Sequence, residues 1–294
     1  MCIRDRGRIE GEFSVSRIGE DEFFLFGSQA AEVHHPRWFL AHLPADSSIE
    51  FEVLALSMVG LTVAGPHARD VLQQLTDTSL ASNDFPFMAF RKVDLGMAPV
   101  WLSRMTYSGD LGYEIWVQPE YQRYLFDLIW EAGQQFGIGL FGFRALITMR
   151  LEKNFGTWFR EYRPIYTPLE AGMDRVLKFD HEFIGRDAVE AEIAGGGPKR
   201  KLVMFRVEVD PEAPADVIGD EPVWHCGPDG DAVVGWITSG GYAHYSGVSL
   251  ALGYIPAELA TDGTGFEIEI IGRRRPATLQ HEPVLDPQGL RMRA

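Results

Sequence analysis

A carboxylate and an aromatic ring follow a glycine-containing turn near the middle of this 294-residue chain. The turn spans Ser108 to Gly112, and Tyr113 to Val117 is typical of the strand that leaves it. Because side chains alternate along a strand, Glu114 and Trp116 share one face. A hydrogen-bond acceptor beside an aromatic ring suits a flat ligand rich in N–H donors. A solvent-facing glutamate on an exposed strand is the competing interpretation of the same spacing.

Further aromatic residues are candidates for the wall of a ligand pocket. Tyr107 precedes the turn, and Trp158 and Tyr162 lie further along the chain. Aromatic side chains suit a pocket that holds a flat molecule. A half-buried strand tyrosine and ordinary core residues are equally compatible with these positions, so both interpretations stay open.

A short basic stretch interrupts an acidic chain. The protein has 27 Lys and Arg against 42 Asp and Glu, a formal net charge of −15. Between Arg144 and Arg163 the sign reverses, with five basic residues and two acidic ones. This stretch could attract an anionic ligand, or it could be a solvated helix surface balanced by nearby acids. The overall charge disfavours nucleic acid as a partner, because an acidic surface repels phosphates.

Composition narrows the class of protein further. Hydrophobic residues make up 46% and charged residues 23%, which is typical of a globular chain. No apolar run reaches the roughly 20 residues that a membrane helix needs, so no membrane partner is expected. Cys2 and Cys226 are too few for a disulfide framework, and they suit a reducing compartment such as the cytoplasm, or the mitochondrial matrix in a eukaryote. His34 and His35 are interpreted as strand neighbours that point in opposite directions, and no metal site is predicted.

Periodicity predicts an α+β fold with two domains. The clearest helix runs from Pro119 to Phe136, and Gly195 to Pro198 resembles a flexible linker. Residues 7–195 are predicted to form an α+β domain. Residues 199–294 carry short strands at regular spacing and are predicted to form a small all-β barrel.

Several local predictions accompany this outline. Ile9 to Val15 and Phe51 to Leu56 have the alternation of strands. Arg273 to Arg275 is interpreted as a short basic surface turn. Residues 1–6 are interpreted as a remnant of cloning or sequencing, since Gly7 opens directly onto sequence typical of the middle of a domain.

The segment from Tyr107 to Glu114 resembles the Y-T/S-G-E/D-x-G-Y-E motif of the folate-binding aminomethyltransferase family, whose type member is the glycine-cleavage T-protein. Other segments match in the family's order: Gly65 to Leu72, Arg150 to Glu152, Thr167 to Gly172, Phe183 to Arg186, Thr238 to Gly240 and Gly253 to Pro256. Several motifs in order, over nearly the whole chain from Gly7, are more specific than any one alone. The resemblance implies an N-terminally truncated aminomethyltransferase-like folate-binding domain followed by the family's C-terminal β-barrel.

The resemblance also implies roles for individual residues. Glu114 falls where the family's glutamate accepts the paired N–H groups of a pterin ring, and Tyr107 where a tyrosine lines the same pocket. Glu12 falls where the family has an aspartate near the reactive nitrogens of folate. A carboxylate there could take the N10 proton or stabilise an iminium cation, whereas a solvated strand charge is the alternative.

Arg144 and Trp158 complete the predicted set of cofactor-binding residues, which also includes Trp116. Folate carries an anionic glutamate tail, which the basic stretch could receive. The family's pocket arginine would fall at Leu146 in this chain, which departs from the family pattern. Arg144, two positions away, is a candidate to replace it. Trp158 would contribute pocket wall, or else belong to the core.

Within the family, the segments from Arg150 to Lys153, from Ser249 to Ala251 and from Arg291 to Arg293, together with Trp158, most resemble the folate half of dimethylglycine and sarcosine dehydrogenases. The resemblance implies tetrahydrofolate-dependent capture of the methylene or iminium carbon of a small N-methyl amine as 5,10-methylenetetrahydrofolate. FAD is expected only in an N-terminal amine-oxidising half missing from this chain, because no G-x-G-x-x-G fingerprint follows a strand here. Two alternatives stay open: a folate-binding module that is inactive without its flavin partner half, and a methyltransferase or demethylase that acts on another methyl donor.

Overall fold

The structure, a computed structural model, describes residues 1–228 and 230–294, which divide into two compact units. Unit 1 comprises Met1–Ser14, Phe26–Arg37 and Asn154–Val284, and unit 2 comprises Val15–Leu25, Trp38–Lys153 and Leu285–Ala294. Each unit therefore joins segments that are far apart in the sequence. Helices and antiparallel sheets together give the α+β class that the sequence predicts.

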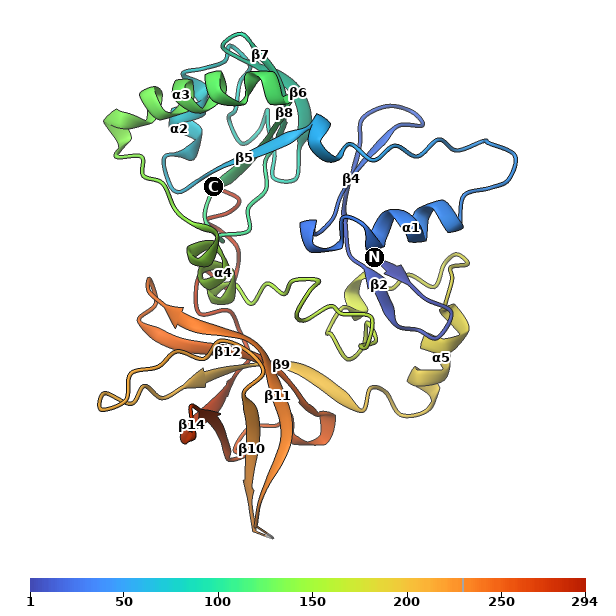
Figure 1. The fold of residues 1–294 in the computed structure, drawn as a ribbon, viewed down its shortest axis with the longest axis vertical. Helices are drawn as coiled ribbons and strands as arrows, with labels where there is room; N and C mark the ends of the chain where they lie inside the picture. Colours follow the sequence, from blue (N-terminus) through green and yellow to red (C-terminus); the bar gives the residue numbers. More distant parts are fainter. Residues whose placement is uncertain (229) are drawn as a thin grey trace. The chain divides into compact units, whose positions relative to one another are not determined.

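The framework of unit 2 is a four-stranded antiparallel sheet with the order β5–β8–β7–β6 (Figure 1). Its strands are β5 (Val59–Ala64), β6 (Phe90–Leu95), β7 (Ala98–Ser103) and β8 (Gly112–Val117). On one face Tyr113 and Ile115 are fully buried in a core shared with two helices, α2 (Ala68–Gln73) and α3 (Gln122–Gly133). Glu114 and Trp116 alternate with these residues and therefore belong to the opposite face.

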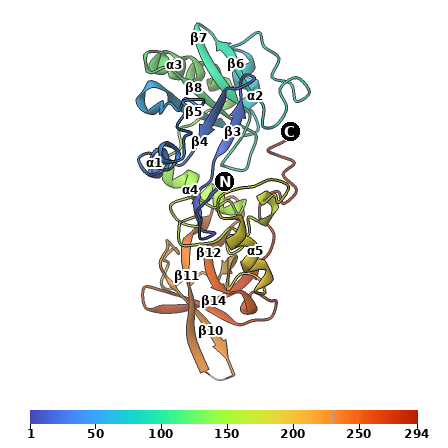
Figure 2. The same ribbon diagram turned by 90° about the vertical axis from the view of Figure 1, so that its right-hand side faces the viewer.

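Three further segments complete unit 2. Residues 15–25 carry most of a hairpin of β3 (Ser14–Arg17) and β4 (Phe23–Phe26), which lies beside the sheet in Figure 2. Phe24 of this hairpin contacts rings of β6 and β7. Helix α4 (Phe143–Glu152) follows α3 along the chain. Residues 285–294 return to this unit after the last strand of the barrel.

Unit 1 is built around a closed antiparallel barrel with the order β10–β11–β12–β9–β14–β13, in which β13 pairs back with β10. The strands are β9 (Arg200–Val207), β10 (Pro222–Gly227), β11 (Gly230–Ala243), β12 (Val248–Pro256), β13 (Phe266–Ile270) and β14 (Arg273–Gln280), coloured yellow to red in Figure 1. Alternate residues such as Phe205, Ile237 and Ile268 fill its interior. The predicted barrel is therefore confirmed.

The remaining elements are short. Unit 1 also holds the paired strands β1 (Cys2–Ile3) and β2 (Ile9–Gly11) and the helix α5 (Arg186–Ala194), while α1 (His34–Ala41) begins in unit 1 and ends in unit 2. Single 3₁₀ turns occur at Gln29–Ala31, Ala55–Ser57, Pro119–Tyr121, Gln134–Phe136, Asp174–Val176 and Ala257–Leu259. Within the described residues, no helix has the length and apolar character needed to cross a bilayer.

One strand prediction is wrong and another is confirmed only in part. The segment from Phe51 to Leu56 forms no strand and ends in a 3₁₀ turn. The segment from Ile9 to Val15 is broken at Glu12, where the chain leaves β2 before β3 begins. Alternation over a few residues is weak evidence for a strand, because a strand also needs a neighbouring chain to pair with.

Two other local predictions are also wrong. His34 and His35 start helix α1 and are not strand neighbours. Arg273 to Arg275 begins strand β14, and Arg275 is only 5% exposed because its guanidinium donates hydrogen bonds to the carbonyls of Ala213 and Ala215. Residues 2 and 3 pair with β2, and the foreign origin of residues 1–6 stays a prediction.

Candidate functional site

Glu114 lies in the middle of a polar row that crosses the unit 2 sheet. It is directly opposite Thr62 on β5 and Ser103 on β7. Opposed residues of antiparallel strands project from the same face, so the two hydroxyl groups flank the carboxylate. This face is the one that α2 and α3 leave uncovered.

Aromatic rings border the polar row. Trp116 is opposite Gly60 on β5, where a Cβ atom would lie 3.2 Å from the indole, so the missing side chain leaves room for this ring. Trp101 stacks on Phe90 with ring centroids 5.1 Å apart and planes inclined by 2°. Phe24 packs edge-on against both rings, with centroids 5.4 and 5.5 Å away. The carboxylate therefore has flat apolar groups beside it.

The Glu114 carboxylate is partly buried, and no hydrogen bond or ion pair of its side chain occurs among the described residues. Burial alone raises its pKa from the ordinary 4.5 to about 7. A carboxylate that is withdrawn from water without a compensating donor is costly, and such groups are concentrated at functional sites. Glu114 therefore combines an unused acceptor with a perturbed pKa.

Residues 104–111 form the loop that joins β7 to β8 and carry Tyr107, which is partly buried. Gly109 in this loop has φ +88°, a conformation that favours glycine. A Cβ atom there would lie 2.2 Å from Cγ of Lys153, so the stem of Lys153 passes directly over the glycine. The turn predicted from the sequence thus has both a backbone and a packing reason for Gly109.

The basic stretch does not form one exposed patch. Arg144, in the first turn of α4, is exposed, whereas Arg150 is fully buried and Lys153 is 5% exposed. Arg160 belongs to unit 1 and forms an ion pair with Asp220 at 3.4 Å. Among the basic residues of α4, Arg144 is the one left in solvent.

Glu12 and Trp158 lie in unit 1, whereas the other predicted site residues lie in unit 2. Glu12 follows β2 and is partly buried, and burial raises the pKa of its carboxyl. The indole N–H of Trp158 donates a hydrogen bond of 3.0 Å to the carbonyl of Glu10, which ties the ring to β2. Glu12 and Trp158 therefore both lie next to strand β2.

An acid–base pair that the sequence did not reveal lies next to these residues. Nε2 of His34 is 2.6 Å from a carboxylate oxygen of Glu10, which is 3% exposed. His35 packs against Trp158 with ring centroids 4.9 Å apart, and burial lowers its pKa to about 4. Pro36, which suits the first turn of a helix, was the sequence signal that the two histidines begin α1.

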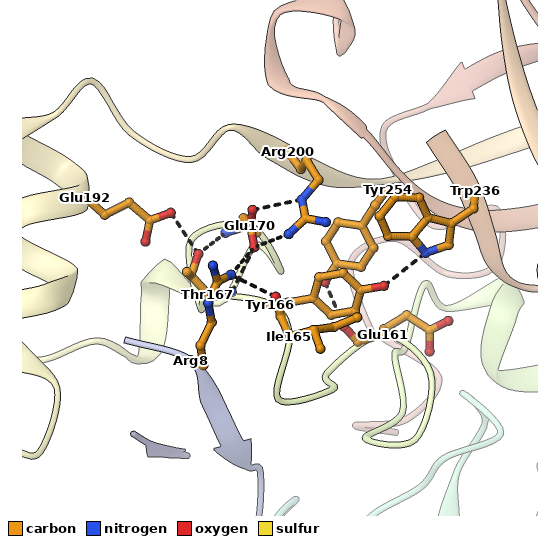
Figure 3. Close-up of polar contacts among 10 residues, drawn as sticks. All are labelled: Arg8, Glu161, Ile165, Tyr166, Thr167, Glu170, Glu192, Arg200, Trp236 and Tyr254. Atoms are coloured by element: carbon orange, nitrogen blue, oxygen red, sulfur yellow. Dashed lines mark hydrogen bonds and ion pairs between the residues drawn. The ribbon is translucent and has the colours of Figure 1, made fainter. Parts of the chain in front are cut away.

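Unit 1 also contains an ionic network around the buried carboxylate of Glu170, drawn in Figure 3. The Glu170 carboxylate accepts hydrogen bonds from Arg8 (3.2 Å), from Arg200 (3.1 and 3.4 Å) and from the backbone N–H of Thr167 (3.0 Å). Thr167 in turn donates its hydroxyl to Glu192 at 2.9 Å. This carboxylate is fully committed to protein donors, so it is a structural group.

A second buried carboxylate in unit 1 is satisfied in the same way. Glu161 is fully buried, and one of its oxygens accepts the hydroxyls of Thr238 and Ser239, both at 2.6 Å. Its other oxygen accepts the backbone N–H of Thr157 at 2.9 Å. Tyr254 donates to the carbonyl of Glu161 at 2.7 Å, which fixes this loop against the barrel.

One group of metal-ligating atoms lies within 4.8 Å of one another in the described part of the chain, formed by Cys226, Asp231 and Glu267. Arg274 already forms ion pairs with Asp231 at 2.7 Å and Glu267 at 3.6 Å. Cys226 is also exposed. The guanidinium supplies the positive charge that these carboxylates need.

Two family models match the chain. The GCVT N-terminal domain matches residues 1–181, and the glycine cleavage T-protein C-terminal barrel domain matches residues 200–286. The chain belongs to the aminomethyltransferase, or glycine cleavage T-protein, family, whose members are folate-binding proteins of one-carbon transfer.

Two relatives represent the range of similar proteins. Mitochondrial dimethylglycine dehydrogenase of Mus musculus is 36% identical over 99% of this chain and 33% of its own length. The aminomethyltransferase of Clostridium botulinum (strain Loch Maree / Type A3) is 31% identical over 92% of this chain and 70% of its own length. The chain thus spans about a third of the length of the dehydrogenase relatives that it matches.

A solved structure supports the fold. The glycine cleavage system aminomethyltransferase T from Bartonella henselae superposes with a TM-score of 0.80 over 97% of this chain and 74% of that one. The sequence identity is 22%, so this likeness concerns the fold alone.

Proposed function

We propose that this chain binds tetrahydrofolate and uses it to capture a one-carbon unit from a small N-methyl amine as 5,10-methylenetetrahydrofolate. The observation that carries the proposal is the Glu114 carboxylate, which is withdrawn from water and lacks a protein donor among the described residues. The paired N–H groups of a pterin ring can donate to both oxygens of one carboxylate.

The surroundings of Glu114 fit such a ring. Trp116 lies on the same face, and the hydroxyls of Thr62 and Ser103 flank the carboxylate, so a flat donor-rich ligand meets an acceptor bordered by apolar surface. Tyr107 is on the loop that leads into β8 and would line the same site. We assign Glu114 to the pterin N–H pair, and Tyr107 and Trp116 to contacts with its rings.

The remaining predicted residues have separate roles. Arg144 is exposed and free to face the anionic glutamate tail of folate. Trp158 is tied to the carbonyl of Glu10, which places an aromatic surface in the β2 neighbourhood. We assign its ring to contact with the ligand.

Glu12 is the proposed proton acceptor. Reduced folate supplies the two nitrogens that bond to the captured carbon, and a proton is released for each iminium carbon that is captured with departure of the amine. Burial raises the pKa of this partly buried carboxylate, which makes it a stronger base than an ordinary glutamate and suits it to accept that proton. Holding the two reactants together would make the capture effectively intramolecular.

The proposed donor is an amine of the dimethylglycine or sarcosine type. The support for it is the identity of 36% to a mitochondrial dimethylglycine dehydrogenase, of which this chain spans 33%. A flavin-dependent amine-oxidising domain would then belong to another part of the full-length protein, and the matrix would be its compartment in a eukaryote. A folate-binding module that is inactive without that domain is the alternative, and it predicts folate binding with no formaldehyde-dependent turnover. The second candidate function is a methyltransferase or demethylase that takes the carbon from another donor. Its support is the identity of 31% to an aminomethyltransferase.

Titration with tetrahydrofolate tests the pterin assignment. Glu114→Gln keeps the shape of the side chain but replaces one acceptor oxygen with a donor, so it should weaken binding by about 30-fold or more, since each hydrogen bond to a charged group contributes roughly 1.5–3 kcal/mol. Tryptophan fluorescence quenching under anaerobic conditions measures the dissociation constant. Glu131→Gln, at an exposed position of α3, is the matched control.

Two measurements bear on the proposal directly. Equal affinity of wild type and Glu114→Gln would remove the pterin assignment. Formaldehyde-dependent formation of 5,10-methylenetetrahydrofolate above the uncatalysed rate, lost in Glu12→Gln while tetrahydrofolate still binds, would support the proton acceptor. An unchanged rate in that variant would remove this role from Glu12.

A further inference from the structure

The segment of residues 285–294 has no role in the proposed chemistry, yet it is fastened to unit 2 at several points. It lies almost entirely beyond residue 286, where the match to the family's barrel domain ends. Its first residue, Leu285, donates its backbone N–H to the carbonyl of Glu152 at 3.0 Å. The segment therefore leaves the barrel and packs against the end of α4.

The first fastening is a buried ion pair. Nζ of Lys153 is 3.7 Å from a carboxylate oxygen of Asp286 and donates a hydrogen bond to its carbonyl, and the side chains are only 4% and 9% exposed. The Asp286 carboxylate also accepts the backbone N–H groups of Leu290 (2.8 Å) and Arg291 (2.9 Å). Burial raises the pKa of Asp286, but these N–H groups and the Lys153 charge outweigh it and lower the pKa overall.

Lys153 also contacts the loop that precedes β8, so it links the segment to that loop. Its Cγ atom would lie 2.2 Å from a Cβ at Gly109, so the lysine stem covers the turn of residues 104–111. Arg291 adds a second link, because its guanidinium is 3.9 Å from the carboxylate of Asp110 in the same loop.

The far end of the segment makes the third link. Arg69 and Arg104 both donate hydrogen bonds to the carbonyl of Ala294. Arg104 is 1% exposed and follows β7 directly, and Arg69 also donates to the hydroxyl of Tyr113, the neighbour of Glu114 on β8. The segment thus reaches both ends of the loop.

We propose that residues 285–294 are a strap that positions the loop of residues 104–111, and with it Tyr107 and Glu114, for a reduced folate. The inference rests on the proposed function for its ligand. Lys153 and Asp286 are positioning residues in this scheme, since they act on the site through Gly109.

Amide hydrogen exchange in the free protein tests the strap without any ligand. Asp286→Asn removes the charge that pairs with Lys153 and weakens the turn that Asp286 holds, so amides of residues 104–111 should exchange at least about tenfold faster, because local opening then costs less. Asp127→Asn makes the same chemical change in the exposed Arg123–Asp127 pair of α3 and should leave that loop unchanged.

The same variants are then titrated with tetrahydrofolate. Asp286→Asn should weaken binding by about tenfold, within the usual range of coupling between sites. Lys153→Met keeps the stem over Gly109 but removes the charge. It should give a similar loss, and the double variant should lose no more than either single one, because both changes break one link.

A control separates positioning from general destabilisation. Leu125→Ala removes a fully buried core side chain of α3 and should speed exchange across the whole sheet, whereas the strap variants should affect residues 104–111 selectively. If Asp286→Asn does not fold, Lys153→Met carries the test.

The outcomes are distinct. Unchanged exchange of residues 104–111 in both strap variants, or faster exchange with unchanged tetrahydrofolate affinity, would overturn the strap while leaving the proposed function in place. A wild-type chain that does not bind tetrahydrofolate would overturn the proposed function together with the strap's assignment to folate.

Discussion

Two carboxylates withdrawn from water have opposite surroundings in the two units. Glu170 in unit 1 accepts hydrogen bonds from Arg8, Arg200 and Thr167, so both of its oxygens are satisfied within the protein (Figure 3). Glu114 in unit 2 has no donor among the described residues, and burial raises its pKa to about 7. Burial by itself therefore does not distinguish a carboxylate that the protein satisfies from one that it leaves without donors.

The two carboxylates differ in the source of their hydrogen-bond donors. A buried charge is tolerated when partners compensate for the lost hydration, and a half-satisfied one is costly. Glu170 receives that compensation from its own chain, so its removal should affect folding. Glu114 would receive its hydrogen-bond donors from a ligand, so its replacement should weaken ligand binding. The replacement should also remove the cost of burying an uncompensated charge in the free protein.

The largest expected effect is on the structural side of this comparison. Glu170→Ala leaves the guanidinium groups of Arg8 and Arg200 without their carboxylate and removes the acceptor for the N–H of Thr167, so the free energy of unfolding should fall by about 3 kcal/mol. Urea denaturation followed by circular dichroism measures it.

The matched control for this prediction is Glu190→Ala. Glu190 forms an exposed pair with Arg186 on α5, and such surface pairs contribute little, so the change should stay within about 0.5 kcal/mol. If Glu170→Ala folds with unchanged stability but binds tetrahydrofolate more weakly, Glu170 is a ligand-binding group and not a structural one.

The sequence predicted the local part of the Glu114 site. The turn before β8 and the alternation that puts Glu114 and Trp116 on one face follow from residue type and period, and the structure has both. The resemblance to the aminomethyltransferase family singled out this carboxylate among 42 acidic residues. The barrel was also predictable from its regularly spaced strands.

The non-local part could not be predicted. The rings of Phe24, Phe90 and Trp101 border the carboxylate's face from three other strands, and no spacing within β8 indicates them. The same limit explains the mistaken surface turn at Arg273 to Arg275, since these arginines pair with β13 at the start of a barrel strand. Helix α1 was missed because its eight residues are too few for a clear period.

The pH dependence of binding sharpens the comparison at Glu114. If the ionised carboxylate accepts the pterin N–H pair, affinity should rise with pH as Glu114 ionises around pH 7 and should be about tenfold weaker at pH 6 than at pH 8. Titrations across this range measure it. The dependence should vanish in Glu114→Gln, and a wild-type profile parallel to that of the variant would contradict the assignment.

The stability of the free protein should change in the opposite direction. The folded chain holds a proton on Glu114 that the unfolded chain releases, because the pKa is about 7 in the fold and 4.5 ordinarily. This group's contribution to stability is therefore full below pH 4.5 and is lost as pH rises to about 7. Glu114→Gln, which never ionises, should be more stable than wild type at pH 8 in thermal unfolding, and equal midpoints would show that burial does not penalise Glu114.

The smallest expected effect concerns the aromatic border of the site. A Cβ atom at Gly60 would lie 3.2 Å from the Trp116 indole, which is tighter than an ordinary contact, so Gly60→Ala should shift that ring. We expect tetrahydrofolate affinity to fall by about fivefold, at the lower end of overpacking costs. Stability should change little, because alanine also reduces the entropy that a strand glycine loses on folding.

Gly139→Ala is the control for this change, because Gly139 is also exposed and a Cβ atom there would meet nothing within 4 Å. The Trp116 ring should report the shift directly through the near-ultraviolet circular dichroism of the free protein. An affinity that is unaffected in Gly60→Ala while this signal changes would mean that the ligand touches the acceptor without resting against the indole. The site would then be defined by Glu114 and its flanking hydroxyls, and the aromatic border would belong to the packing of the sheet.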